Sequence, residues 1–342
     1  MPDSRLFNVA VVGATGLVGE ALCDVLGQRH FPIDQFYPLA SESSRGKRVT
    51  LGDRMVVVEE LDSFDFRKAD IALFSAGGAV SKHYAPRAAA AGCVVVDNTS
   101  EFRYDDDVPL VVPEVNASAL ENWADRRIIA NPNCSTIQLM VALKPLHDLA
   151  PIRRIDVATY QSVSGAGRKG IEQLAGQTAT LLNGREIELG DKEPRIAFNV
   201  WPHIDEFQDN RYTREEMKMV WESQKILGDP SIIVNPTAVR VPVFYAHSEA
   251  VSVEFKSKIS ASEAIEALQR ADGVKVIDDA VHGGYPTAAQ IGTSSDAVYV
   301  GRVREWLDGG PGLNLWVVAD NVRKGAALNS VQIAEILVKD YL

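Results

Sequence analysis

The chain has 342 residues, of which 46% are hydrophobic and 24% are charged, and its formal net charge is −11. This length exceeds what one hydrophobic core usually organises, so we expect two domains. The acidic balance argues against nucleic acid or an anionic membrane surface as a partner, and no apolar run approaches the roughly 18 residues of a membrane span. Because Met1 to Phe7 lacks a basic flank followed by an apolar core, we expect a cytoplasmic protein.

The cysteine content limits the possible thiol chemistry. The three cysteines, Cys23, Cys93 and Cys134, are too few and too scattered for a disulfide framework. No C-x-x-C pair suggests a zinc site, and we expect no metal. Any thiol chemistry is therefore catalytic or absent.

The N-terminal part of the sequence alternates between strand and helix patterns. An apolar run predicts a first strand buried on both faces, and a helical stretch follows it to about Arg29. The other predicted elements are the strands Phe36 to Ala40, Ile71 to Ser75 and Val94 to Asp97, and an alanine-rich helix from Val80 to Ala91. The pattern predicts an α/β domain with a doubly wound, Rossmann-like parallel sheet.

A glycine-rich loop lies between the first predicted strand, Phe7 to Val12, and the helix after it. Its spacing is G-x-x-G-x-x-G, which by itself could be an ordinary strand-to-helix turn. Its position favours a dinucleotide site, because glycines there allow a pyrophosphate to approach the helix N-terminus. The candidate cofactor residues are Gly13, Thr15, Gly16, Leu17 and Val18.

The segment after the second predicted strand bears on the choice of dinucleotide. An NAD enzyme usually places an acidic residue there to bind the ribose. Here the candidates are hydroxyl groups and a guanidinium, which suit a 2′-phosphate: Ser41, Ser43, Ser44 and Arg45. Glu42 is an awkward neighbour, and the segment could also be a solvated loop. The sequence favours NADP over NAD.

Cys134 lies where a strand-like run, Arg127 to Ala130, gives way to a helix-like run, Ile137 to Leu149. A thiol at a helix N-terminus faces unpaired backbone N–H groups and the positive end of the helix dipole, and both favour the thiolate. The same N–H groups could hold an oxyanion on a carbonyl that the sulfur attacks. The alternative is a small, buried apolar residue. Cys134 is the candidate nucleophile.

The pattern changes after Cys134, where a second domain begins. Long alternating runs indicate a mixed or antiparallel sheet: Ile155 to Val163, Val239 to Phe255, Val298 to Val303 and Leu313 to Ala319. Helices are expected near Gly170 to Leu182 and Ala261 to Arg270, and a final helix from about Gly325 to Leu342 could return to cover the first domain. We therefore expect an NADP-binding domain of residues 1–133 with 321–342, and an α+β catalytic and dimerisation domain of residues 134–320.

Six motifs together resemble the aspartate-β-semialdehyde dehydrogenases. They are Val11 to Gly19, Asn131 to Thr136, Gln161 to Gly167, Arg240 to Val243, His247 to Glu249 and Asp320 to Ala327, and they span nearly the whole chain. The resemblance implies conversion of β-aspartyl phosphate and NADPH to aspartate β-semialdehyde, phosphate and NADP, in the biosynthesis of lysine, threonine, methionine and isoleucine. It implies a thioester on Cys134 that hydride then reduces.

The resemblance also implies roles for individual residues. Besides Cys134, the catalytic candidates are His247 as the acid/base group and Gln161, which orients the acyl intermediate. Arg240 matches the partner of the α-carboxylate, and Arg103, Lys218 and Asn133 match phosphate-binding positions. Ser164, Gly165 and Asn321 match cofactor contacts.

Each of these roles has a simpler structural alternative. His247 could be a buried structural group, Arg103 could form a surface ion pair with the Asp105 to Asp107 segment, and Lys218 could lie on a solvated helix face. Arg240 and His247 would face opposite ways in one unbroken strand, so a bulge or bend near Pro242 is needed for both to reach one pocket.

Two other functions are compatible with the same motifs. N-acetyl-γ-glutamyl-phosphate reductase performs this chemistry on a longer acyl phosphate, and a catalytically silent relative would only bind NADP or a partner. The resemblance further implies a homodimer, or a tetramer, built through the second domain. The apolar strands Val251 to Phe255 and Leu313 to Val318 could belong to that interface or to the core.

Overall fold

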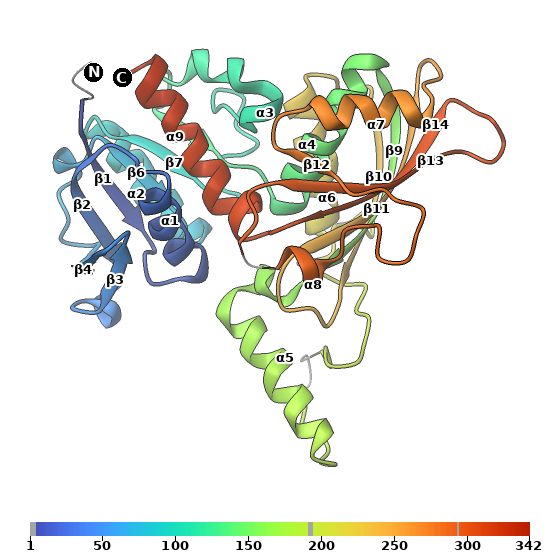
Figure 1. Ribbon diagram of the computed structural model, residues 1–342. Coiled ribbons are helices and arrows are strands. Elements are labelled where there is room, and N and C mark those ends of the chain that lie inside the picture. The colour runs from blue at the N-terminus through green and yellow to red at the C-terminus, as the bar shows by residue number, and fades with distance from the viewer. Residues whose placement is uncertain (1–4, 191–193, 293) are drawn as a thin grey trace. The chain divides into compact units, whose positions relative to one another are not determined.

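The computed structural model describes residues 5–190, 194–292 and 294–342 (Figure 1). The chain forms two compact units, one of Met1–Asn133 with Gly325–Leu342 and one of Cys134–Lys324. Residues 1–4 of the predicted first domain, and 191–193 and 293 of the predicted second, lie outside the described residues. Among the described residues, none of the helices combines the length and the apolar character that a membrane crossing requires.

The first unit contains a six-stranded sheet in the order β5-β2-β1-β6-β7-β8, and all of its strand pairs are parallel. The strands are β1 Phe7–Val12, β2 Ile33–Ala40, β5 Glu59–Glu60, β6 Ile71–Phe74, β7 Val94–Asp97 and β8 Ile128–Ala130. The helices are α1 Leu17–Gln28, α2 Gly78–Ala90, the short α3 Pro113–Asn116 and α9 Leu328–Asp340. This confirms the predicted doubly wound, Rossmann-like sheet.

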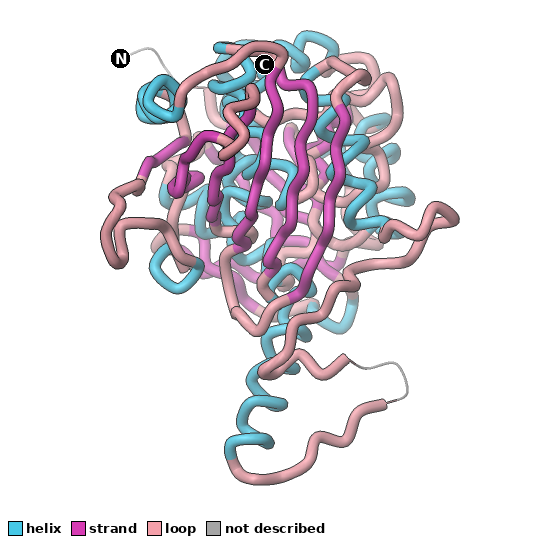
Figure 2. The backbone as a smooth tube through the Cα atoms, turned by 90° about the vertical axis from the view of Figure 1, so that its right-hand side faces the viewer, coloured by secondary structure: helices cyan, strands magenta, loops and turns pink. Residues whose placement is uncertain are grey.

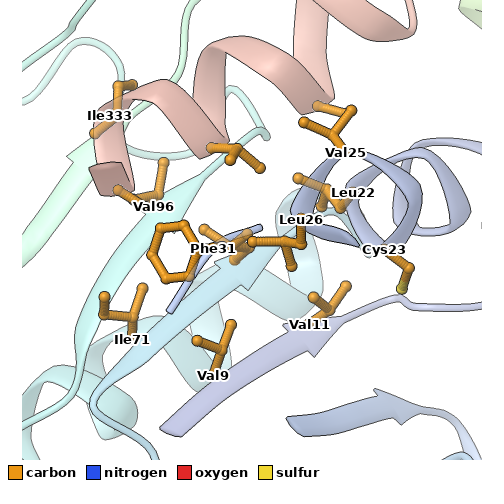
Figure 3. Packing of buried hydrophobic residues seen from close by; sticks show 14 of the residues in the cluster. Val9, Val11, Leu22, Cys23, Val25, Leu26, Phe31, Ile71, Val96 and Ile333 are labelled. Carbon is orange, nitrogen blue, oxygen red and sulfur yellow. The ribbon is translucent and has the colours of Figure 1, made fainter. Parts of the chain in front are cut away.

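The core of the first unit explains why the last helix returns to it. Side chains of β1, β6 and β7 pack against α1 and α9, so residues from both ends of the chain share one apolar cluster (Figure 3). Leu22 and Leu26 of α1 and Ile333 of α9 are essentially inaccessible to solvent. The last predicted helix begins with a π-helical turn, Arg323–Ala327, before α9.

The strand order identifies the edge of this sheet where a ligand is expected to bind. β2 and β6 flank β1 on opposite sides, so the chain reverses its direction of winding at β1. Such switch points, at the carboxyl ends of parallel strands, are where open α/β sheets bind ligands. The glycine-rich loop follows β1 directly, and it therefore lies at the switch point.

This unit also contains a hairpin that was not predicted. Strands β3 Arg48–Leu51 and β4 Arg54–Val57 pair through a two-residue turn at Gly52, whose φ is +56°. The strands are short, four residues each, and the apolar run Met55 to Val58 over the second of them was not interpreted as a strand.

The second unit contains a mixed six-stranded sheet in the order β10-β9-β11-β14-β13-β12. The strands are β9 Ile152–Gln161, β10 Ile233–Arg240, β11 His247–Phe255, β12 Val274–Val276, β13 Val298–Glu305 and β14 Gly312–Ala319. The helices are α4 Cys134–Leu149, α5 Gly167–Leu182, α6 Arg214–Leu227, α7 Ala261–Arg270 and α8 Ala288–Ile291. The predicted mixed-sheet domain is confirmed, with α6, α8, β10 and β12 as additional elements.

The two faces of this sheet differ. Helices α4, α6 and α7 pack against one face, where alternate residues of β11, such as Val251 and Val253, are buried. Figure 2 looks onto the other face, where the strands lie in front and the short helix α8 packs beside Trp316 and Val318 of β14. There the intervening residues, such as Ala250 and Ser252, are half-buried. The apolar side chains of Val251 to Phe255 and Leu313 to Val318 therefore mostly belong to the core.

The alternating run from Val239 to Phe255 holds the last two residues of β10, a bend and all of β11. β10 ends at Arg240 and pairs in parallel with β9, whereas β11 begins at His247 and pairs with the other edge of β9 in antiparallel fashion. Pro242 has no N–H for a ladder, and Ala246 has a positive φ of 68°, so the chain cannot continue as one strand. The bend predicted near Pro242 is present.

Candidate active site

Cys134 is the first residue of α4, so its thiol stands at the N-terminus of a 16-residue helix. Cys134 is half-buried, whereas Cys23 and Cys93 are buried. Burial raises the pKa of Cys23 to about 12 and also raises the pKa of Cys93, so both thiols stay protonated near neutrality. Among the three thiols, position and access favour Cys134 as the nucleophile.

Gln161 and His247 meet where β9 ends and β11 begins. The backbone N–H of Ser162 donates to His247 Nδ1 at 3.0 Å, and His247 Nε2 lies 3.5 Å from Gln161 Nε2. Thr159 Oγ1 donates to Gln161 Oε1 at 3.1 Å, and Gln161 Nε2 donates to Glu215 Oε1 at 3.1 Å. Gln161 is 1% exposed and His247 is fully buried, and these bonds fix their orientations.

His247 is neutral at physiological pH. Burial and the positive charge of Arg240 together lower its pKa to about 3, against the opposing influence of Glu215 and the Ala246 backbone. The acid/base role of His247 stays a prediction.

Arg240, the last residue of β10, reaches the same pocket. Its Nη1 donates to the carbonyl of Ser162 at 2.6 Å. Burial lowers its pKa, against the raising influence of Glu215 and Cys134. Segment 241–244 runs beside 162–164, because Val163 N–H donates to Val243 O and Ser164 N–H to Phe244 O. The bend thus brings the side chains of Arg240 and His247 close together, as the prediction of a bend near Pro242 requires.

Gly165 lies directly against these two side chains. A methyl group added at its Cα would stand 2.9 Å from Arg240 Nη1 and 3.3 Å from His247 Cε1. The sequence predicts a cofactor contact at this position, and its nearest neighbours in this unit are Arg240 and His247.

Glu215 belongs to this cluster and was missed. It lies in the first turn of α6, is 6% exposed, and accepts a bond from Lys218 Nζ at 3.0 Å as well as from Gln161. Lys218 also contacts Asp205 Oδ2 at 2.8 Å. Burial lowers the pKa of Lys218, but Glu215 and Asp205 together raise it more. Lys218 therefore faces the site and is not on a solvated helix face.

Ser164 and Asn321, predicted as cofactor contacts, bond to each other. Ser164 Oγ donates to Asn321 Oδ1 at 3.0 Å, and both residues are 4% exposed. This bond places Asn321 in the second unit, so that the chain returns to the first unit at Gly325 and not at 321.

Arg103 and Asn133 lie in the first unit, with 6% and 7% of their surfaces exposed. Arg103 Nη2 donates to the carbonyl of Asn98 at 2.8 Å. Among the neighbouring acidic residues, Asp105 and Asp107 both contact Arg126. Arg103 is therefore a buried arginine and not one exposed at the surface.

The glycine loop has the geometry of a phosphate-binding turn. Gly13 has a φ of +86°, and a methyl group at Gly19 would lie 2.0 Å from the carbonyl oxygen of Gly13. Helix α1 begins at Leu17 behind Gly16, and no side chain of the described residues caps its first N–H groups. A pyrophosphate could accept those N–H groups, so the loop fits a dinucleotide.

The segment from Ser41 to Arg45 lies beside this loop. Thr15 Oγ1 is 3.4 Å from Ser44 Oγ, which also receives Lys47 Nζ at 3.3 Å, and Ser41 and Ser43 share a bond of 3.0 Å. Arg45 is 69% exposed in its side chain and contacts Glu60 at 3.4 Å. Lys47 was not predicted, although a second cation three residues after Ser44 was visible in the sequence.

These features define a class of protein. A phosphate-binding loop lies at the switch point of a parallel sheet. A thiol stands at a helix N-terminus in a unit that also contains Gln161, Arg240 and His247. This combination suits a nicotinamide-dependent dehydrogenase that works through an enzyme thioester. Family models agree: residues 8–123 match the NAD binding domain of semialdehyde dehydrogenases, and residues 143–324 match their dimerisation domain.

Individual relatives narrow the class. The chain is 59% identical to aspartate-semialdehyde dehydrogenase of Legionella pneumophila over 99% of its length and 98% of the relative. It is 57% identical to aspartate-semialdehyde dehydrogenase 2 of Vibrio cholerae over 99% of both chains. A crystal structure of aspartate semialdehyde dehydrogenase II from Vibrio cholerae, complexed with ASA, superposes with a TM-score of 0.96 at 56% identity, covering 99% of this chain and all of that one. The chain belongs to the aspartate-semialdehyde dehydrogenase family.

Proposed function

We propose that the chain reduces β-aspartyl phosphate to aspartate β-semialdehyde with release of phosphate, using NADPH. This proposal rests on one observation. The side chains of Gln161, Arg240 and His247 lie close together in the unit whose first helix begins at Cys134. A family that acts on a semialdehyde needs a nucleophile, an anion-binding arginine and a polar group at the reacting carbonyl.

The chain's own residues divide the reaction between them. The Cys134 thiolate attacks the acyl carbon, the C–O bond to phosphate breaks, and a thioester remains. The nicotinamide dinucleotide, when bound, supplies the hydride. Gln161 and His247 hold the acyl group by its oxygen, and Gln161 is itself held by Thr159 and Glu215.

The charged residues match the charges of the substrate. Arg240 suits the α-carboxylate, because a planar guanidinium can bond two oxygens at once. Glu215, a buried anion beside Arg240, suits the ammonium group. We assign the phosphate to Arg103 and Asn133. Lys218 stays a predicted phosphate ligand, although its ammonium here bonds Glu215 and Asp205.

A phosphate-dependent assay tests the proposal. We expect the chain to reduce NADP in the presence of aspartate semialdehyde and phosphate, and Cys134→Ser to abolish nearly all of this while keeping the wild-type melting temperature. Mass spectrometry should find substrate carbon on Cys134, with Cys23→Ala as the matched control. An acyl group on Cys23 or Cys93, or a preference for the N-acetylated glutamyl homologue, would refute the assignment.

We further propose NADP over NAD as the cofactor. A 2′-phosphate would lie in the segment after β2, which offers it the hydroxyls of Ser41, Ser43 and Ser44 and the cations of Arg45 and Lys47. Each charge-assisted hydrogen bond to the phosphate contributes about 1.5–3 kcal/mol. Arg45 contacts Glu60, so Glu60 competes with the phosphate for its guanidinium.

The preference should be at least about tenfold in kcat/KM, which corresponds to roughly 1.4 kcal/mol. Arg45→Ala should lower it, and Glu60→Gln should raise it by releasing the guanidinium. Equal kcat/KM for both cofactors in the unmodified enzyme would show that this loop does not select for the 2′-phosphate.

We propose a homodimer through the open face of the second sheet. Tyr160, Ile233 and the half-buried side chain of Ala250 lie on β9, β10 and β11, and a dimerisation-domain model matches this unit. Ala250→Arg, which puts a charge in the middle of that face, should yield a monomer in sedimentation velocity. Leu307→Arg is the control, since Leu307 is fully exposed in the turn between β13 and β14. A dimer or tetramer unaffected by Ala250→Arg would place the interface elsewhere.

A further inference from the structure

Asp205 has no role in the proposed reaction, but it contacts a residue of the site directly. Its Oδ2 accepts a bond from Lys218 Nζ at 2.8 Å, and Lys218 Nζ also donates to Glu215 Oε2 at 3.0 Å. The side chain of Lys218 is 12% exposed and that of Asp205 is 30% exposed. One largely buried ammonium group is therefore held between two carboxylates, and such charge-assisted bonds are stronger than neutral ones.

The backbone at Asp205 presents its carboxylate to Lys218. Asp205 has a left-handed φ of 69°, a conformation that aspartate and asparagine tolerate better than most residues with a side chain. Its Oδ1 accepts from the N–H of Glu206 at 2.9 Å, while its Oδ2 accepts from Lys218. Four residues earlier, Trp201 exchanges two backbone bonds with Arg240, at 2.9 and 2.8 Å. This segment is therefore anchored beside Arg240 at one end and at Lys218 at the other.

The charges of these side chains can be counted against those of the substrate. The proposed substrate has an α-carboxylate, assigned to Arg240, and an α-ammonium group. Lys218 and Glu215 alone would form a neutral pair, with no net charge to attract an ammonium group. Together with Asp205 they form a cluster of two anions and one cation, which has one net negative charge. Lys218 keeps its proton there, because burial lowers its pKa but the two carboxylates together raise it more.

We infer that Asp205 is a positioning residue that sets substrate specificity: it balances the charge of Lys218, so that Glu215 can attract the free α-ammonium group of the substrate. The inference rests on the proposed function for the identity of the substrate. It extends that function by naming the class of substrate that the pocket selects, an amino acid whose α-amino group is not acylated. An N-acylated homologue has no positive charge to offer the cluster, so it forfeits this attraction.

The predicted role of Lys218 gives Asp205 an alternative role. If Lys218 binds phosphate, Asp205 would compete with the phosphate for the same ammonium group. Removing Asp205 would then strengthen phosphate binding and leave the binding of the semialdehyde unchanged. Because the reaction assayed with NADP takes aspartate semialdehyde and phosphate as separate substrates, their two KM values distinguish these roles.

Asp205→Asn tests the charge count with little change in shape, since asparagine also tolerates a positive φ. We expect the KM for aspartate semialdehyde to rise about threefold to tenfold, the effect of losing one partly exposed charge, while kcat changes less than about twofold. The control is Asp148→Asn, which removes an exposed carboxylate paired with Lys144 on α4. An unchanged KM for aspartate semialdehyde would overturn the inference, and a lower KM for phosphate alone would make Asp205 a competitor of phosphate.

A double variant tests whether charge is the cause. Adding Lys218→Met to Asp205→Asn removes the cation that Asp205 balances, so the cluster again has one net negative charge. The KM for aspartate semialdehyde should therefore return to within about twofold of the unmodified value, even where the KM for phosphate rises with the loss of Lys218. Effects that simply add in the double variant would show that Asp205 acts through structure and not through charge.

A binding measurement without turnover separates this inference from the proposed function. L-Aspartate and N-acetyl-L-aspartate differ at the α-nitrogen, so NMR titration of the whole chain with each measures recognition of the ammonium group. We expect the unmodified chain to bind L-aspartate at least about tenfold more tightly, and Asp205→Asn to reduce that preference about threefold to tenfold. An equal preference in both chains, or none in the unmodified chain, would overturn the inference.

Two further outcomes have a definite meaning. If Asp205→Asn does not fold, Lys218→Met gives the converse test, because its cluster is more negative and the preference for L-aspartate should then rise; a fall would overturn the inference. A chain that shows the expected preference, and loses it in Asp205→Asn, but does not act on aspartate semialdehyde would refute the proposed function and leave the role of Asp205 intact.

Discussion

Gly165 sets the space available to the two most important side chains of the site. A methyl group there would lie 2.9 Å from the Arg240 guanidinium, closer than real side chains tolerate, and 3.3 Å from the His247 ring. Arg240 is tied to Ser162 and His247 is fully buried, so neither can move away without losing a bond.

We therefore predict that Gly165→Ala lowers kcat/KM by about tenfold to hundredfold, since a displacement near 1 Å at a reacting group can cost a hundredfold. Steady-state kinetics and a thermal melt measure the effect. The control is Gly176→Ala, at an exposed position in α5 where a methyl group meets nothing within 4 Å among the described residues. Equal losses in both variants would mean that the effect is not specific to the pocket.

At the scale of single residues, the sequence identified site residues where the local pattern is distinctive. It missed site residues that lie in a common pattern. Cys134 follows a short strand and opens a helix, and the helix indeed begins there. Glu215 was missed because Glu-Glu-x-Lys is also a common pattern of exposed helices. Its burial depends on Gln161, 54 positions earlier, which no local pattern reveals.

Two adjacent glutamates in the first turn of helix α6 have different roles, one in the candidate site and one in the stability of the helix. Glu215 faces Gln161 and Lys218 in the site. Its neighbour Glu216 forms a capping box with Thr213 and accepts the N–H of Ala238 at 3.0 Å, which joins the helix to β10. One carboxylate serves the pocket and the adjacent one holds the helix in place.

Adjacent substitutions should separate these roles. Glu215→Gln should raise the KM for aspartate semialdehyde at least about tenfold, because it removes the anion that faces the ammonium group, with little change in melting temperature. Glu216→Ala should lower the free energy of unfolding by about 1–3 kcal/mol through the lost cap and the unpaired Ala238 N–H, while kcat/KM stays near wild type. The reverse pattern would show that the two roles are exchanged.

The predicted elements were most accurate where the chain is locally regular. β1, α7 and the strands β6 and β7 agree with the apolar patterns within a residue or two. In the run from Val239 to Phe255 the bend near Pro242 was predicted, but the beginning of β10 at Ile233 was missed. The pairing of β10 and β11 with opposite edges of β9 depends on tertiary structure, which no local pattern reveals.

At the scale of the whole molecule, two buried groups of β11 impose opposite pH dependence on stability. The folded pKa of His247 is depressed to about 3, so below about pH 6.5 only the unfolded chain takes up its proton and stability falls as the pH falls. The folded pKa of Glu249 is raised well above its usual value by complete burial. Above about pH 4.5 only the unfolded chain releases that proton, so stability falls as the pH rises.

The protonation of Glu249 has a structural counterpart. Both of its carboxyl oxygens, and the Oε1 of Gln138 on α4, are buried acceptors without a donor among the described residues. Burial raises the pKa of Glu249 against a hydrogen bond from Gln138, which lowers it, and a proton on the carboxyl group supplies a donor for these acceptors. Gln138 Nε2 in turn lies 3.4 Å from the carbonyl of His247. A neutral Glu249 thus links the helix that begins at Cys134 to the strand that begins at His247.

We predict that Glu249→Gln removes the loss of stability above pH 6.5, where His247 no longer contributes. In the unmodified chain, the free energy of unfolding should fall by up to about 1.4 kcal/mol per pH unit from this group until the folded pKa of Glu249 is reached. The carboxamide that replaces the carboxyl group has no proton to lose and can still donate to Gln138, so the variant should be nearly as stable as wild type at pH 5 and increasingly more stable toward pH 8. Denaturant unfolding at several pH values measures the difference, with Glu266→Gln, an exposed carboxylate on α7, as the control. If the two chains lose stability in parallel between pH 6.5 and 8, Glu249 is ionised in the folded protein and its burial must be compensated by a donor other than its own proton.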